Sequence, residues 1–385
     1  MSAPKVLIWE SLGILAGGQK VALQIAQALG ERHHCLFFLP EEGPLAAALK
    51  EEGLPYHLLP IGHYSVGSKG LRDCARYVSK TPYILVRAAR LLRREKVGLI
   101  YVNGARNFLW AALLGKALGL PVIWHVHNFF QERQARRLIR AAGALKSVKK
   151  IVFVSQAVQR PFSSLAAKSL VIPNGLDHAG FLGAAGMGPG IREELSLPAD
   201  RQLIAHIGWI MPSKNQEALV RAIPLIIKEQ PWSHFLFIGG VRNGYAGYFQ
   251  KLQALVKALG IEDNTTFTGH RPDVPRIFPD LSLHVITSEE AFPLALLEAW
   301  AAGVPTVGPN LGVIPEMMEP GKTGLVYDPR HPQDLAARIV TLLADASLWR
   351  EISRHSRAKA QEFDIRAFNA KITSLVETTL SCASC

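Results

Sequence analysis

The chain has 385 residues, of which 49% are hydrophobic and 19% charged, so it can bury sizeable cores and is not expected to be disordered. Its length suggests two domains or slightly more. No apolar run reaches the roughly 18 residues of a transmembrane helix, and no signal peptide is expected ahead of the strand-like start. The net charge of +12 favours an anionic partner. Nucleic acid is the weaker choice, because no zinc-finger spacing or RNA-binding aromatic motif is present.

The four cysteines have no disulfide-framework spacing and are Cys35, Cys74, Cys382 and Cys385. The last two have the C-x-x-C spacing of metal and redox sites, but no second pair of ligands accompanies them. We therefore expect a reduced cytoplasmic protein without a metal centre.

Short apolar runs alternate with helical stretches in the first half of the chain, which indicates a parallel sheet covered on both faces. The expected strands are 5–9, 34–39, 98–102, 122–126, 151–154 and 169–172. The expected helices are 18–29, 44–52, 82–96, 108–118 and 131–147.

Glycine and proline then accumulate, so residues 179–199 are interpreted as a linker between a first domain, 1–178, and a second, 200–362. In the second domain the expected strands are 203–207, 234–238, 265–268, 283–287, 306–308 and 325–327. The expected helices are 215–229, 248–259, 293–302, 332–344 and 348–360. A last amphipathic helix is expected at 363–380, within a tail of residues 363–385. Two doubly wound domains would place the carboxyl ends of both sheets around an interdomain cleft, where ligands bind.

Residues 288–305 lead from a buried strand through a loop into an Ala/Leu-rich helix. Pro293 stands where a first helical residue is expected, a position that tolerates proline. Glu290 then lies on the loop and Glu298 on the helix. A loop at a helix N-terminus fed by a parallel strand is a common place to bind an anion or a nucleotide. On their own, however, the two glutamates fit a solvated loop and helix better.

Other strand ends also carry polar or glycine residues. Gly17 and Gly18 follow the first strand, where they allow close backbone approach to a ligand or form a simple turn. His125 and His127 share one face of a strand, and either can be a cleft residue or a structural histidine. Lys214 lies near a helix N-terminus and is a candidate phosphate ligand, although an isolated lysine is usually solvated.

Taken in order, these segments resemble the family 4 retaining glycosyltransferases, and the resemblance covers nearly the whole chain. The residues that carry it are Gly17, Gly18, His127, Asn128, Ser155, 172–177, Gly208, Lys214, Thr268, Gly269, Glu290, Glu298, 303–305, Pro315, Glu316, Gly321 and Gly324. The resemblance implies the GT-B fold, with two Rossmann-like domains and a C-terminal helix that crosses back to the first domain.

The resemblance also implies roles for single residues. Glu298 would hold the ribose of a nucleotide-sugar donor, Glu290 the sugar hydroxyls, and Lys214 the pyrophosphate, with His127 near the reacting sugar. Gly18 would let the first domain close onto the phosphate. The implied catalytic residues are His127, Glu290 and Lys214, and the implied donor-binding residues are Gly17, Gly18, Gly208, Trp209, Lys214, Arg242, Glu290, Ala291, Phe292, Pro293, Leu294 and Glu298. No cofactor and no metal would be needed.

Three departures from the family pattern concern the phosphate site. Trp209 stands where the family usually has an arginine, and Pro293 where it has a glycine. The usual Gly-Gly before Pro315-Glu316 is replaced by residues 311–314. An arginine–phosphate contact is worth roughly 2–3 kcal/mol, so a substitute cation is expected. Arg242 is the first choice and Arg271 the second.

Two basic stretches in the first domain suggest where the positive charge acts. The helix expected at 131–147 carries Arg133, Arg136, Arg137 and Arg140, with apolar residues on another face, and residues 65–80 are also basic. Such helices are typical of membrane surfaces, but a solvated helix face is an equal alternative. We expect a cytoplasmic protein that transfers a sugar to a saccharide or lipid-linked acceptor in cell-envelope or exopolysaccharide synthesis, with an anionic membrane surface as a further partner. The alternatives are a non-catalytic GT-B protein with a degenerate donor site and, less favoured, a glycan phosphorylase.

Overall fold

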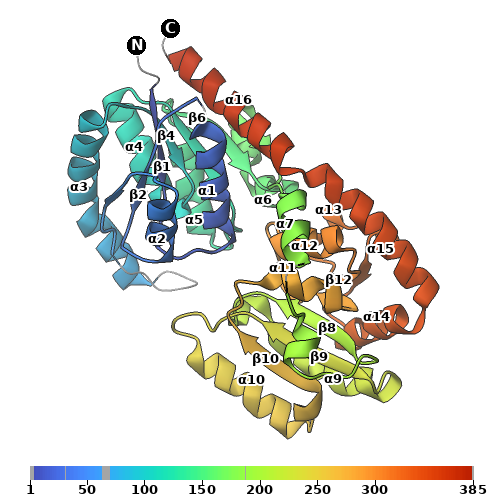
Figure 1. The fold of residues 1–385 in the computed structure, drawn as a ribbon. Helices are drawn as coiled ribbons and strands as arrows, with labels where there is room; N and C mark the ends of the chain where they lie inside the picture. The colour runs from blue at the N-terminus through green and yellow to red at the C-terminus, as the bar shows by residue number, and fades with distance from the viewer. Residues whose placement is uncertain (1–3, 31, 63–69, 187, 384–385) are drawn as a thin grey trace. The chain divides into compact units, whose positions relative to one another are not determined.

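The computed structural model describes residues 4–30, 32–62, 70–186 and 188–383. The chain forms two compact units. The first contains Met1–Asn174 together with Arg366–Cys385, and the second contains Gly175–Ile365 (Figure 1). Each unit is a parallel sheet covered by helices, as the alternation of strands and helices predicts.

The first unit is built on a parallel sheet with the strand order β3-β2-β1-β4-β5-β6-β7. The strands are β1 (Lys5–Trp9), β2 (Cys35–Leu39), β3 (Tyr56–Leu58), β4 (Val97–Val102), β5 (Val122–Val126), β6 (Val148–Phe153) and β7 (Ser169–Val171). The central strands are buried nearly throughout, because helices cover both faces of a parallel sheet.

The helices of the first unit are α1 (Gly17–Gly30), α2 (Pro44–Glu51), α3 (Leu71–Arg94), α4 (Phe108–Leu118), α5 (Arg133–Gly143), α6 (Gln156–Gln159) and the 3₁₀ segments η1 (Ala105–Asn107) and η2 (Arg160–Lys168). Helix α4 packs between α3 and α5. The last helix, α16 (Ile365–Ala383), ends the chain in this unit, where Glu377 pairs with Arg32 at 2.8 Å and the Phe368 ring stacks on His125.

The second unit has a parallel sheet with the order β10-β9-β8-β11-β12-β13. Its strands are β8 (Gln202–Ile207), β9 (Ser233–Ile238), β10 (Thr265–Gly269), β11 (Leu283–Val285), β12 (Thr306–Pro309) and β13 (Leu325–Tyr327). Its helices are α7 (His178–Ala185), α8 (Ile191–Glu194), α9 (Gln216–Glu229), α10 (Ala246–Ala258), α11 (Val274–Ile277), α12 (Leu294–Ala302), α13 (Ile314–Met317), α14 (Pro332–Ala344) and α15 (Ala346–Ala360), and its 3₁₀ segments are η3 (Pro212–Lys214), η4 (Glu262–Asn264), η5 (Phe278–Asp280) and η6 (Gln361–Phe363).

Several segments differ from the sequence prediction. Strand β3 was not expected, and α5 is shorter than the helix expected at 131–147. Two larger differences concern α3 and the segment 179–199. Helix α3 begins at Leu71 and carries Pro82 in its interior, whereas the helix was expected to begin at residue 82. Tertiary contacts hold its first turns, since the Tyr77 ring stacks on Trp110 at 4.4 Å and Trp110 Nε1 donates to Thr81 Oγ1. The segment 179–199, interpreted as a linker, contains helical residues of α7 and all of α8, because Asp177 caps α7 and Phe181 and Ile191 are buried in the core of the second unit.

In both sheets the strand order reverses once, between β1 and β4 and between β8 and β11. Ligands of doubly wound sheets bind outside the carboxyl ends of the strands at this point. The residues that directly follow these strands are therefore the place to look for a site. Within the described residues, no helix is both long and apolar enough to cross a membrane.

Candidate active site

The strand reversal of the second unit brings together a lysine and a glutamate that the sequence predicts to act on one ligand. Lys214 ends η3 after β8, and Glu290 lies on the loop after β11. Lys214 Nζ lies 2.6 Å from Glu290 Oε1, and Ser288 Oγ donates to the same oxygen at 2.5 Å. The side chains of Lys214 and Glu290 are 28% and 14% exposed, so the pair is held by the protein and still reaches solvent.

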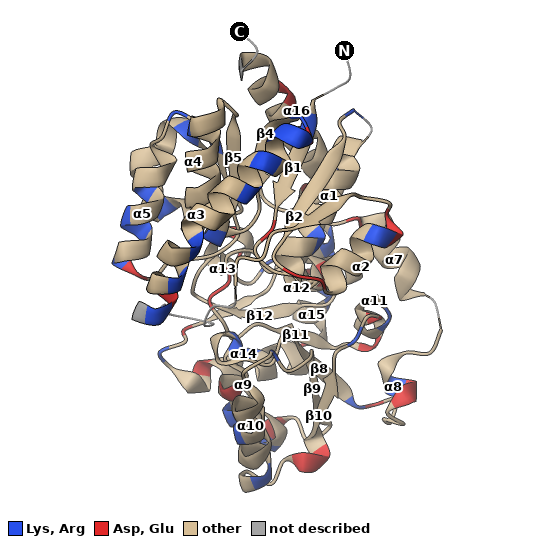
Figure 2. Cartoon of the chain, turned by 90° about the vertical axis from the view of Figure 1, so that its left-hand side faces the viewer, with Lys and Arg blue, Asp and Glu red and all other residues tan. Residues whose placement is uncertain are grey.

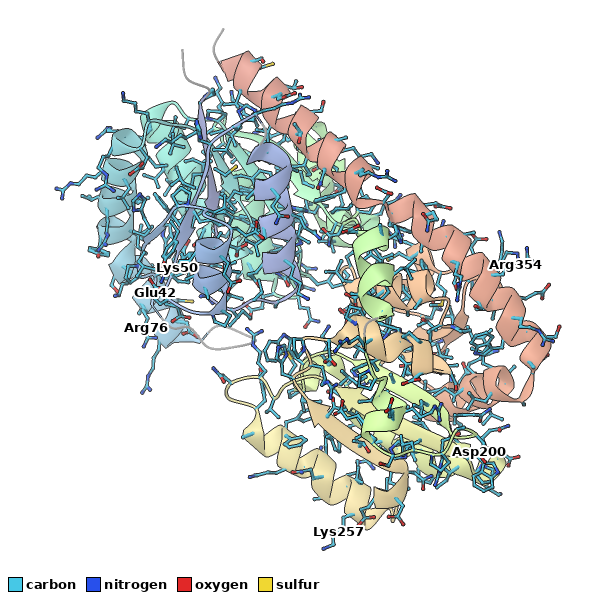
Figure 3. The ribbon with its side chains drawn as sticks, in the orientation of Figure 1. Glu42, Lys50, Arg76, Asp200, Lys257 and Arg354 are labelled. Atoms are coloured by element: carbon cyan, nitrogen blue, oxygen red, sulfur yellow. The ribbon has the colours of Figure 1, made fainter. Side chains whose placement is uncertain are left out.

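An exposed ion pair shows the contrast. Glu42 and Lys50, labelled in Figure 3, are 3.3 Å apart, but their side chains are 54% and 63% exposed. Such surface pairs contribute little to stability. The pairing of Lys214 with Glu290 is instead a fixed feature of a sheet edge.

Buried polar groups beneath Lys214 fix its backbone. Thr287 Oγ1 donates to the Lys214 carbonyl oxygen at 2.7 Å, and His206 Nε2 lies 3.1 Å from the same hydroxyl. Burial, and to a smaller extent the Lys214 charge, lowers the pKa of His206 to about 4. Asn215, in the left-handed conformation at φ 51°, donates its side-chain amide to the Thr287 carbonyl oxygen. The loops after β8 and β11 are thus locked together, which places the cation of one beside the carboxylate of the other.

Gly312 supports the backbone of Glu290 from behind. Its φ is +58°, and a Cβ at this position would lie 2.5 Å from the Glu290 carbonyl oxygen. That oxygen accepts the Val313 N–H at 2.9 Å. A side chain at position 312 would therefore displace the Glu290 loop.

Helix α12 begins one residue later than predicted. Pro293 is its N-cap residue, with φ −82° and ψ 106°, and Leu294 is its first residue. The first N–H groups of a helix have no intrahelical acceptor and attract anions. Phe292 packs edge-on against Phe363, which anchors the loop, and Glu298 is half-buried on the next turn of the helix. Ala291 lies on the same loop and is half-buried.

A second cation lies at the neighbouring strand ends. Gly208 follows β8 and Gly239 follows β9, and a Cβ on Gly239 would lie 2.0 Å from the Gly208 carbonyl oxygen. This close approach leads directly into Trp209, whose ring stacks on His270 at 6.3 Å and lies beneath the Arg242 guanidinium at 5.6 Å. The indole thus holds Arg242 beside the position where the family pattern has an arginine.

Arg271, the second choice for a substitute cation, is used differently. It donates to both carboxylate oxygens of Glu194 and to both of Asp273. These contacts raise its pKa and occupy its guanidinium group. Arg271 therefore ties α8 to the loop after β10 and is not available to a phosphate.

In the first unit, polar residues that directly follow β1, β4 and β5 form a connected network. They are Glu10, Asn103 and His127. Asn103 Nδ2 donates to Glu10 Oε1 and, at 2.8 Å, to the Gly18 carbonyl oxygen. Asn103 Oδ1 lies 2.7 Å from His127 Nε2. Gly17 is the exposed first residue of α1. Because Asn103 contacts both Gly18 and His127, the predicted glycine loop and the predicted histidine meet at one sheet edge.

Burial tunes the titrating groups of this network. Glu10 is fully buried, and desolvation raises its pKa to about 7, although the hydrogen bonds from Gln19 and Asn103 act to lower it. Desolvation lowers the pKa of His127 to about 4. The neighbouring His125 is buried, its Nδ1 lies 3.0 Å from the Tyr101 hydroxyl, and its pKa is well below the usual value. His125 is therefore a structural histidine, one of the two alternatives that the sequence leaves open.

Sequence reasoning missed Glu10 and Asn103. Both directly follow strands that pair with each other, β1 and β4, and the Asn103 N–H donates to the Trp9 carbonyl oxygen at 3.1 Å. The rule that selects His127, a polar residue at the carboxyl end of a parallel strand, selects them as well. A single Glu after β1 carries no motif, and so it was overlooked.

The predicted basic surface lies on α5 and α3 (Figure 2). Arg133, Arg137 and Arg140 are exposed and Arg136 is half-buried, while Arg140 also donates to the Pro161 carbonyl oxygen. On α3 the exposed charged side chains are all cationic, namely Arg72, Arg76, Lys80, Arg87, Arg90, Arg93 and Arg94. Residues 65–69 of the second predicted basic stretch, and Cys385 of the C-x-x-C pair, lie outside the described residues.

Two Rossmann-like units, with a glycine turn and a histidine in one and a Lys–Glu pair beside a helix N-terminus in the other, define a GT-B glycosyltransferase. Residues 15–179 match the family described as Glycosyltransferase Family 4, and residues 201–345 match the one described as Glycosyl transferases group 1. The chain belongs to the family 4 glycosyltransferases.

Two relatives and a solved structure illustrate the range of similar proteins. Spore coat protein SA of Bacillus subtilis is 30% identical over 88% of each chain. N-acetyl-alpha-D-glucosaminyl L-malate synthase of Bacillus anthracis is 24% identical over 94% of this chain and 93% of its own. Anabaena HepE, solved in complex with UDP and glucose, superposes with a TM-score of 0.81 at 22% identity and covers 97% of this chain and 99% of its own. At that identity the likeness shows the fold alone.

Proposed function

We propose that this glycosyltransferase transfers a sugar from a UDP- or GDP-sugar, with retention of anomeric configuration, to a saccharide or lipid-linked acceptor in cell-envelope or exopolysaccharide synthesis. One observation carries the donor site. Lys214 and Glu290 meet at 2.6 Å where the strand order of the second unit reverses, at the loop that leads into the N-terminus of α12. This arrangement offers a cation, helix N–H groups and a carboxylate to one ligand.

The pyrophosphate would be bound by charge and by backbone donors. Lys214 supplies one cation and Arg242, held over the Trp209 ring, supplies a second. The N–H groups of Leu294 and of the residue after it begin α12 and add the helix dipole. Pro293 donates no N–H here, so the cations carry a larger share of the binding.

The sugar and ribose would be bound by carboxylates. Glu290 Oε1 accepts from Lys214 and Ser288, and within the described part of the chain its Oε2 has no partner and can accept from a sugar hydroxyl. Glu298, on the second turn of α12, would take the ribose hydroxyls. A free carboxylate oxygen suits a hydroxyl-rich ligand, because a carboxylate only accepts hydrogen bonds.

The reaction would depend on stabilising the leaving phosphate. Charge develops on the nucleoside diphosphate as the bond to the sugar breaks, and the preorganised Lys214 and Arg242 meet that charge. The leaving phosphate can then take the proton of the acceptor hydroxyl, so retention needs no protein nucleophile and no metal. The anomeric configuration of the product, measured by NMR coupling constants, tests retention; an inverted product would contradict it.

A non-catalytic role is the second candidate, motivated by Trp209 and Pro293. The ring of Trp209 supports a cation, which favours a rebuilt phosphate site over a degenerate one. Thermal shifts against UDP, GDP, ADP, UDP-glucose and GDP-mannose separate the candidates when combined with assays for released nucleoside diphosphate. We expect stabilisation by one base class and slow release from its sugar. Stabilisation without any release would favour the non-catalytic role.

We also propose that the first unit approaches an anionic membrane surface. The exposed cations of α3 flank exposed apolar side chains, Val78, Tyr83 and Val86, and α5 adds exposed Leu138 beside its arginines. Cations beside apolar side chains suit an interface of anionic lipids. Co-sedimentation should show binding to vesicles that contain phosphatidylserine and a loss of binding as salt rises. Equal binding to neutral vesicles would contradict this proposal.

A further inference from the structure

The network behind His127 determines which ring nitrogen carries the proton. The Gly18 carbonyl oxygen can only accept a hydrogen bond, so the Asn103 atom that faces it at 2.8 Å is the amide nitrogen. The same nitrogen faces Glu10 Oε1, which accepts its second hydrogen. The oxygen of Asn103 must then face His127 Nε2. Because that oxygen is only an acceptor, Nε2 carries the hydrogen and Nδ1 carries the lone pair.

Each member of this network is fixed by further contacts. Glu10 Oε2 accepts from Gln19 Nε2 at 3.1 Å and from the Ser11 N–H at 3.3 Å, and the Glu10 carbonyl oxygen accepts from Asn107 Nδ2 at 2.9 Å. The His127 ring packs on the His125 ring, with centroids 4.0 Å apart. The imidazole therefore has one supported orientation.

We propose that Glu10 and Asn103 are positioning residues, which hold His127 as the Nε2–H tautomer and leave its Nδ1 to accept a hydrogen bond from a substrate hydroxyl. The proposal rests on the proposed function for the identity of the substrate. Within the described part of the chain, the Asn103 contact is the sole hydrogen bond of the His127 ring. Burial keeps the imidazole neutral near pH 7, because the pKa of His127 lies at about 4, so the Nδ1 lone pair is free under working conditions.

The two positioning residues differ in what a conservative change does. Glu10→Gln keeps an oxygen toward Asn103, and its new amide group faces Gln19, whose own amide can turn over to accept. The change gives up the longer contact from the Ser11 N–H, because an amide NH2 group cannot accept it. Asn103→Leu keeps approximate size and removes both the acceptor for His127 and the donors to Glu10 and Gly18. The first variant should retain the tautomer, and the second should release it.

Nitrogen-15 NMR of histidine-labelled full-length protein tests the proposal. His127→Gln assigns the signal, and two-bond correlations in the remaining spectra report which nitrogen is protonated. We expect the Nε2–H tautomer in the wild type and in Glu10→Gln, and a mixture of tautomers in Asn103→Leu. An Nδ1–H tautomer in the wild type would overturn the proposal, as would an unchanged tautomer in a folded Asn103→Leu. The wild-type spectrum decides even if Asn103→Leu does not fold.

Donor turnover tests the link to substrate, with UDP-glucose and GDP-mannose as probes. Asn103→Leu should lower kcat roughly tenfold, the value of about one hydrogen bond, and leave the Kd for UDP and GDP unchanged, because they carry no sugar. A changed tautomer with unchanged kcat would refute the role of Nδ1. No turnover of any donor by the wild type would instead refute the proposed function, while the NMR result still decides the tautomer.

Discussion

The two sheet edges that carry the candidate site residues have the same topology and opposite chemistry. In the second unit, the edge presents a lysine, an arginine and a carboxylate that remain partly exposed. In the first unit, the edge buries a glutamate, and an asparagine joins that glutamate to a histidine that burial keeps neutral. The edge of the second unit suits an anionic ligand, because charge is already in place. The edge of the first unit suits the orientation of one neutral hydroxyl. The fold supplies the place, and the residues after each strand decide the chemistry.

Removing either member of the Lys214–Glu290 pair should have the largest effect. Lys214→Met and Glu290→Gln should each lower kcat/KM roughly 10²- to 10³-fold, because they remove preorganised stabilisation of the leaving group or of the sugar. Initial rates of nucleoside diphosphate release measure both.

The double variant tests whether the two residues act as one unit. Groups that share a hydrogen bond give non-additive losses. We expect the double variant to be little worse than the poorer single variant. Fully additive losses would mean that the two residues act independently of the hydrogen bond between them.

Much of this second-unit site could be predicted from the sequence. Glu290, Glu298 and Lys214 occupy family-pattern positions, and β13 and α14 of this unit have the predicted bounds, as do β1, β5 and α4 of the first unit. Pro293 was placed one residue too far into its helix, because local propensity does not distinguish an N-cap residue from a first helical residue. The ion pair of Arg271 with Glu194 could not be predicted, since the two residues are 77 positions apart in sequence.

The first-unit site was harder to predict, for a physical reason. Glu10 and Asn103 are separated by 93 residues and meet because β1 and β4 pair. Nothing local marks a glutamate that will be fully buried, and a buried acid contradicts the usual preference of that residue for solvent. The length of helix α3 was also underestimated, because proline is typical of a helix start and the helix was therefore expected to begin at Pro82. The packing of Tyr77 on Trp110, which holds the earlier turns, cannot be predicted from local sequence.

The buried Glu10 carboxyl group of the first unit should make the free energy of unfolding depend on pH. Burial raises the pKa of Glu10 from 4.5 to about 7, so the folded protein binds a proton that the unfolded chain releases. Stability therefore falls as pH rises from 4.5 through 7, by about 3 kcal/mol from this group. Glu10→Gln removes that loss, so its free energy of unfolding should gain about 3 kcal/mol relative to the wild type across this interval.

Urea denaturation at several pH values measures this difference. The buried histidines act in the opposite sense, since His127 and His206 have pKa values lowered to about 4 and lose stability as pH falls below 6.5. They contribute equally to both proteins and cancel in the comparison. Parallel curves for the two proteins would show that Glu10 is ionised in the fold at ordinary pH.

Arg242 tests the proposed anion site of the second unit. Arg242→Ala should raise the Kd for UDP or GDP roughly tenfold, because a charge-assisted contact to phosphate is lost. Arg221→Ala on α9, which removes an arginine paired with Glu217, is the matched control and should leave the Kd unchanged. Calorimetry measures both. An unchanged Kd in Arg242→Ala would show that Arg242 is not the second cation of the phosphate site.

The smallest expected effect concerns the membrane surface. Arg137→Gln on α5 should weaken binding to phosphatidylserine vesicles about fivefold, since each cation near the surface contributes about 1 kcal/mol. Lys257→Gln on α10 of the second unit, labelled in Figure 3, removes the same charge elsewhere and should have no effect. Equal losses in the two variants would indicate that binding follows net charge alone.

We propose that the second unit holds a nucleotide-sugar and activates it through Lys214 and Glu290. The decisive measurement is the release of nucleoside diphosphate from a panel of UDP-, GDP- and ADP-sugars, with wild type and Glu290→Gln compared at matched concentrations. We expect release from at least one donor by the wild type and a loss of roughly 10²-fold or more in the variant. Release that is equal in the two proteins, or absent with every donor, would contradict it.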